Sequence, residues 1–133
     1  MYKRQDKDIH LDFVVTDKQE IVLTVDKTAH GWNQEKALEN AESIRYQYDY
    51  YDHQLILDGY WISPAEQKLS PQNVRMTLHV PEGKLLYIDT EISSILAHNI
   101  KNDQDYYRKR IAGHLWKMEK GVLVCQDCTP ISG

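Results

Sequence analysis

The sequence predicts a mainly β domain with one short helix, and three observations carry that prediction. Apolar and polar residues alternate over most of the chain, as in 74–80, which is the period-two pattern of half-buried strands. Nine tyrosines stand against one phenylalanine, and tyrosine suits sheet faces on which its hydroxyl group reaches water. Only one segment, 33–43, has helical spacing between clear start and stop signals.

Length and composition indicate one globular domain. The chain has 133 residues, 41% of them hydrophobic and 27% charged, as is ordinary for a single domain. A formal net charge of -4 argues against a nucleic-acid surface, which is normally positive. No apolar run is long enough to cross a bilayer, and no signal peptide is evident. We place a single β domain at 6–128, after a polar leader at 1–5 that need not be native and before a patternless tail at 129–133.

The elements follow the apolar pattern in chain order. Alternation predicts strands at 9–16, 21–26, 44–51, 54–58, 74–80, 85–89, 114–118 and 122–125. The first two strands are expected to be adjacent. Asn33 is the predicted N-cap of the helix 33–43. The segment 92–107 has helix-compatible spacing at its start and a polar, loop-like second half.

We expect the fold to be arranged around the strand pair in 74–89. One face of 74–80 is apolar, and Pro81 and Gly83 end that strand. The second strand, 85–89, is apolar on both faces, which predicts that it is covered on both sides near the middle of the fold.

Cys125 and Cys128 form a CxxC directly after the last predicted strand. This spacing suits a small disulfide, half of a metal site or thiol exchange. A zinc site requires four ligands, however, and only His114 lies nearby in sequence. We therefore interpret the cysteines as a structural pair, with a disulfide or redox role as the alternative, and assign no metal.

The densest aromatic cluster lies between residues 46 and 61, where Tyr60 and Trp61 are candidates for a binding surface. Aromatic side chains on a sheet bind sugars or a protein partner, although a cross-strand aromatic ladder explains them at least as well. The six histidines are scattered, and no phosphate-binding loop or nucleophile elbow is found. We expect neither an enzyme nor a cofactor.

Several stretches together resemble the C-terminal, toast-rack region of phage shock protein C (PspC) type membrane proteins of the Bacteroidetes. They are LDGY at 57–60, VRMTLHVPEG at 74–83, GHLWKM at 113–118 and GVLVCQDC at 121–128. The resemblance implies a β-solenoid-like sheet domain with one short helix, carried behind a PspC domain and transmembrane helices outside these residues. An antiparallel β-sandwich with one helix is the alternative.

The resemblance also implies a sensor or scaffold of the envelope stress response, with no known catalysis. We expect a non-enzymatic interaction domain, tethered to the bacterial envelope on the periplasmic face, that binds a protein partner or a second copy. One alternative is an envelope glycan-binding module that uses Tyr60 and Trp61. The other is a thiol-redox role of Cys125 and Cys128.

Overall fold

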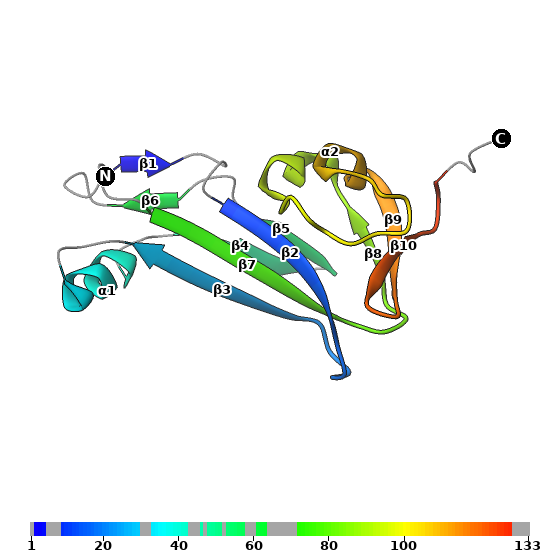
Figure 1. The fold of residues 1–133 in the computed structure, drawn as a ribbon, viewed down its shortest axis with the longest axis horizontal. Coiled ribbons are helices and arrows are strands. Elements are labelled where there is room, and N and C mark those ends of the chain that lie inside the picture. Colours follow the sequence, from blue (N-terminus) through cyan, green and yellow to red (C-terminus); the bar gives the residue numbers. More distant parts are fainter. Residues whose placement is uncertain are drawn as a thin grey trace. The chain divides into compact units, whose positions relative to one another are not determined.

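The computed structural model describes residues 2–4, 9–29, 33–42, 46, 48–51, 53–57, 61–63 and 72–128 (Figure 1). It is 50% strand and 19% helix, so the prediction of a mainly β protein is confirmed. No helix in these ranges has the length and apolar content needed to cross a membrane.

The chain divides into two compact units, Met1–His10 with Val25–Met76 and Leu11–Thr24 with Thr77–Gly133. The elements in chain order are β1 (Tyr2–Arg4), β2 (Ile9–Thr16), β3 (Val22–Ala29), α1 (Gln34–Glu42), β4 (Tyr48–Tyr51), β5 (Gln54–Leu57), β6 (Trp61–Ser63), β7 (Gln72–Pro81), β8 (Leu85–Ile88), η3 (Thr90–Ile95), α2 (Arg108–Ile111), β9 (His114–Glu119) and β10 (Val122–Cys125).

The first unit contains the one helix that the sequence predicts. The side chain of Asn33 caps helix α1 by accepting a hydrogen bond from the backbone N–H of Lys36 at 2.8 Å. Strands β4 and β5 pair antiparallel as expected, with Tyr50 opposite Leu55. Strands β1 and β6 also pair, although the alternation predicts neither of them.

Strand β7 is the middle strand of a three-stranded sheet with the order β2-β7-β3 (Figure 1). The expectation that the two opening strands are adjacent is therefore wrong. Alternate residues of β7 are buried, as the sequence predicts: Val74, Met76 and Val80 completely, and Leu78 with 9% exposed. A long strand with such an apolar face takes the central position between β2 and β3. The polar turn residues at 17–20 do not reveal this order, because they reflect only local geometry.

Strand β8 belongs to a different sheet, with the order β10-β9-β8, so the expected pairing of 74–80 with 85–89 is wrong. The backbone N–H of Gly83, which has a φ of 86°, donates to the carbonyl of Met118 at 2.7 Å. This turn carries the chain from one sheet into the next, because the positive φ that glycine tolerates redirects it.

The prediction that 85–89 is covered on both faces is also wrong. Ile88 is buried, but Leu85 and Tyr87 are 56% and 59% exposed. The opposite face, with Leu86 and Ile88, is the less exposed one, so only one face of β8 faces a core.

The second unit closes its core with a long connection between η3 and β9. Trp116, Met118 and Leu123 are at most 1% exposed, and the Trp116 indole donates to the carbonyl of Ile111 at 2.9 Å. The side chain of Asp89 caps η3 by accepting from the N–H of Glu91 at 2.9 Å. The helix-compatible start of 92–107 thus belongs to a 3₁₀ helix.

Candidate functional site

The two cysteines of the CxxC are joined by a disulfide. Cys125 ends strand β10, Cys128 follows three residues later, and their Cα atoms are 5.7 Å apart. Both side chains are partly exposed. The pair thus has the disulfide that the sequence offered as an alternative, whereas a redox role stays a prediction.

Backbone hydrogen bonds fix the CxxC loop to strand β9. The N–H of Gln126 donates to the carbonyl of Leu115 at 2.8 Å, and the N–H of Leu115 donates to Oδ1 of Asp127 at 3.1 Å. On the other side, the N–H of Cys125 donates to Oδ1 of Asp103 at 2.9 Å. The loop is therefore held from two sides by groups other than its sulfur atoms.

His114 opens strand β9 and lies against the disulfide. Its Nδ1 is 3.1 Å from Oδ1 of Asp127 and 3.9 Å from Sγ of Cys128. Oδ1 of Asp127 is also 3.5 Å from Sγ of Cys125, a van der Waals contact because a disulfide sulfur carries no hydrogen. Four potential ligand atoms, from His114, Cys125, Asp127 and Cys128, lie within 4.8 Å of one another.

Aromatic rings shelter one side of His114. Its ring centroid is 5.7 Å from that of Tyr106 and 6.2 Å from that of Trp116, the latter in an edge-to-face arrangement. The guanidinium of Arg110 lies over the Tyr106 ring, 4.4 Å from its centroid. This packing fixes the imidazole beside the CxxC loop.

In the sequence, His114 is the histidine nearest to the CxxC, and Asp127 belongs to the matched stretch 121–128 but receives no role. The omission arose because the residue inside a CxxC is normally a turn residue with no assigned role. The strand register supplies the missing information, because Cys125 pairs with Trp116 and this places the loop next to His114. An acidic residue inside a CxxC that ends a strand is the signal that such reasoning could have used.

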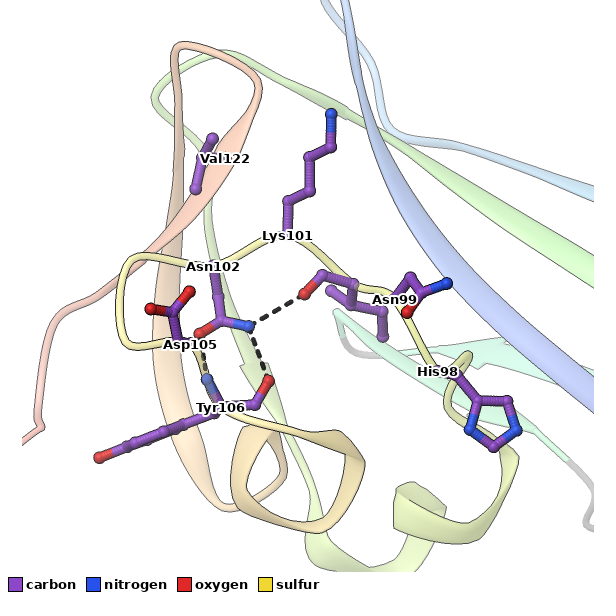
Figure 2. A pocket seen from close by; sticks show the side chains of 8 residues that line it. His98, Asn99, Lys101, Asn102, Asp105, Tyr106 and Val122 are labelled. Atoms are coloured by element: carbon purple, nitrogen blue, oxygen red, sulfur yellow. Dashed lines mark hydrogen bonds between the residues drawn. The ribbon is translucent and has the colours of Figure 1, made fainter.

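A separate hollow of about 330 Å³ lies between Val122 of β10 and the connection at 98–106. Figure 2 shows Asn102 at its centre, where the amide donates to the carbonyls of Ile100 and Tyr106. His98 and Asp105 lie at opposite ends of the hollow (Figure 2). The residues that line it thus bring together no nucleophile and base, and we assign it no chemistry.

The predicted aromatic binding site cannot be built from the structure. Tyr60 lies outside the described residues, and of Trp61 only the backbone, at the start of β6, is described. Its use as a stacking platform stays a prediction.

One family matches nearly the whole chain. The family described as the toast-rack C-terminal region, "ToastRack found in some PspC", matches residues 2–131. Searches of curated proteins and of solved structures returned no match.

Proposed function

Because the chain belongs to the C-terminal toast-rack family found in some PspC proteins, we propose that it is a non-enzymatic interaction domain in which the edge of β8 binds an extended segment of a partner protein. The family is not a known enzyme family, and its link to PspC suggests a membrane-linked parent protein. The single observation that supports the proposal is the exposure of two large apolar side chains on an edge strand.

Those side chains are Leu85 and Tyr87, more than half exposed and two residues apart on one face of β8. Opposite them on β9 lie Lys117 and Leu115. In most proteins a lysine, a proline or a covering loop prevents an exposed apolar edge strand from pairing with another chain. The strand itself, LLYI, contains no lysine or proline, so it favours contact with another chain.

The backbone of β8 also has hydrogen-bonding capacity on its outer side. The carbonyls of Lys84 and Ile88 accept from the side of β9, so the backbone groups of Leu85 and Tyr87 point to the opposite edge. In the part of the chain that the structure describes, no strand pairs with that edge. Addition of a partner strand would satisfy these groups and would place side chains of the partner beside Leu85 and Tyr87 on the same face.

The proposed location is the periplasmic face of the bacterial envelope, where the domain serves a stress-response protein. The disulfide supports an oxidising compartment, because disulfides persist there and are rare in the cytosol. The toast-rack family is also consistent with a solenoid-like arrangement of strands.

Site-specific photocrosslinking in the full-length membrane protein, expressed in its native host, tests the proposal. A benzophenone amino acid at position 87 should give an adduct with one discrete partner protein. The same probe at Tyr50, which is 66% exposed on β4, should not give it. Leu85→Lys should abolish the adduct, because a charged lysine on an edge strand disfavours the addition of another strand. Leu38→Lys, at a residue that is 61% exposed on α1, should leave the adduct intact.

Two outcomes would overturn the proposal. An adduct that survives Leu85→Lys would show that β8 is not the contact. A covalent dimer of the chain would show self-association in place of a partner protein.

A further inference from the structure

The cluster of His114, Cys125, Asp127 and Cys128 contains the donor set of a zinc site. Zinc is bound tetrahedrally by cysteine sulfur, histidine nitrogen and carboxylate oxygen. The two cysteines and His114, the histidine nearest to them in sequence, leave such a site one ligand short. Asp127 can supply the fourth ligand, because its carboxylate oxygen lies within 4.8 Å of the other three donor atoms.

Three distances between the donor atoms lie close to those of a tetrahedral site. Around a zinc ion with ordinary bond lengths, neighbouring nitrogen, oxygen and sulfur ligands are about 3.4–3.8 Å apart. The observed separations are 3.1 Å between His114 Nδ1 and Asp127 Oδ1, 3.5 Å between Asp127 Oδ1 and Cys125 Sγ, and 3.9 Å between His114 Nδ1 and Cys128 Sγ. The nitrogen–oxygen pair is somewhat closer than this range, and the two sulfur atoms, bonded to each other, are far too close.

We propose that His114, Cys125, Asp127 and Cys128 form a tetrahedral Zn²⁺ site that exists only when the disulfide is reduced. An external dithiol reductant supplies two electrons and two protons. The bond between the sulfurs of Cys125 and Cys128 breaks, each sulfur takes up one proton to become a thiol, and the reductant becomes a disulfide. Zinc then displaces the two thiol protons to solvent and binds both thiolates. The redox state of the cysteines thus decides whether the site binds metal.

Reduction should leave the ligands in place, because groups other than the sulfur atoms hold the loop. The N–H of Leu115 holds Asp127, and the carbonyl of Leu115 holds the N–H of Gln126. Tyr106 and Trp116 pack around the imidazole of His114. Opening the disulfide therefore requires only that the sulfur atoms move apart to their spacing in a zinc site, about 3.8 Å.

The partial exposure of the cluster gives a metal ion a path to it. The side chains of His114 and Asp127 are 30% and 45% exposed, and the two cysteines are neither buried nor fully exposed. A reductant and a hydrated ion can both approach a site of this kind, whereas a core disulfide would admit neither.

Cobalt titration of the untagged chain tests the proposal, because Co²⁺ reports both thiolate ligation and tetrahedral geometry in its absorption spectrum. After reduction with a phosphine, one equivalent of Co²⁺ should produce thiolate-to-cobalt charge-transfer bands and strong tetrahedral ligand-field bands. Zn²⁺ should then bleach them. The oxidised chain should show neither, and absence of the charge-transfer bands from the reduced chain would overturn the proposal.

Variants separate the four-ligand site from a simple two-cysteine chelate. His114→Gln and Asp127→Asn should each weaken binding roughly tenfold or more, whereas His79→Gln, on β7, should bind like the parent. Because His114→Gln also alters aromatic packing, His114→Cys provides a second test: a thiolate ligand at that position should restore tight binding. Unchanged affinity in folded His114→Gln would overturn the assignment of the histidine and with it the site.

Discussion

Asp103 accepts a hydrogen bond at Oδ1 from the backbone N–H of Cys125, 2.9 Å away. This bond continues a short ladder in which Leu123 donates to the carbonyl of Lys101 at 3.2 Å and Asp103 donates to the carbonyl of Leu123 at 3.0 Å. A loop therefore closes the outer edge of β10, while the opposite edge strand of the same sheet, β8, has no such cover among the described residues. This asymmetry supports the proposal that a partner strand adds at β8.

Asn102 is expected to hold the loop that covers β10, residues 100–106, in place. Its amide makes four hydrogen bonds within the loop: Nδ2 donates to the carbonyls of Ile100 and Tyr106, and Oδ1 accepts from the N–H groups of Gln104 and Tyr106. Asn102→Ala should cost about 1–3 kcal/mol, since the partners it leaves are part-buried. Hydrogen exchange should accelerate at the amides of Leu123 and Cys125.

The exposed neighbour Asn99 offers a matched control, and Asn99→Ala should leave exchange at both amides unchanged. Equal protection in the two variants would show that the loop holds its position without Asn102.

Met76 tests the inward face of the central strand β7. Its side chain is fully buried, whereas Arg75 points to the exposed face. Met76→Asp buries an unpaired charge at a cost of several kcal/mol, a large part of a typical stability of about 5–15 kcal/mol. We expect the variant to be unfolded by circular dichroism, and Arg75→Asp to melt within a few degrees of the parent. Parent-like melting of Met76→Asp would show that the face is misassigned.

Local patterns in the sequence predict most of the elements but not how the strands are ordered. The alternation at 74–80 correctly identifies a strand with one buried face, and Asn33 correctly marks the start of a helix, because both signals depend on near neighbours. The position of β7 between β2 and β3 depends on pairing between distant segments, which periodicity does not encode. Apolar residues on both faces of 85–88 wrongly suggested burial, because an exposed edge strand can have the same apolar composition as a buried strand.

The candidate site was predictable only in part for the same reason. Cys125 and Cys128 stand out through their spacing, but the approach of His114 follows from the register of β9 and β10. The role of Asp127 becomes visible only when its carboxylate is seen to contact both the imidazole and a backbone N–H.

Gly113 should be less replaceable than Gly83, although both have a φ of 86°. A Cβ at position 113 would lie 3.1 Å from Cγ2 of Thr90, whereas one at position 83 would meet nothing within 4 Å. Gly83→Ala should therefore cost only the backbone strain of a left-handed residue, about 1–2 kcal/mol, and Gly113→Ala should cost more in chemical denaturation. Adding Thr90→Ser removes the methyl group and should return Gly113→Ala to the level of Gly83→Ala. No recovery in this double variant would place the strain elsewhere.

Replacing both cysteines with serine should have a small effect on stability. Cys125 and Cys128 are only three residues apart, and a loop this short restricts few unfolded conformations, so chain entropy predicts a loss of about 2 kcal/mol. The loop is also held by hydrogen bonds in which Leu115 N–H donates to Asp127 and Cys125 N–H donates to Asp103, so the fold and the photocrosslink at position 87 should both persist. The parent reduced with a phosphine in the presence of a metal chelator is the matched control and should melt with the double variant. A much larger loss of stability would show that the disulfide contributes more to the fold than chain entropy predicts. Loss of the crosslink in the folded variant would make the disulfide part of the proposed partner contact, since β8 and the CxxC loop both lie beside strand β9.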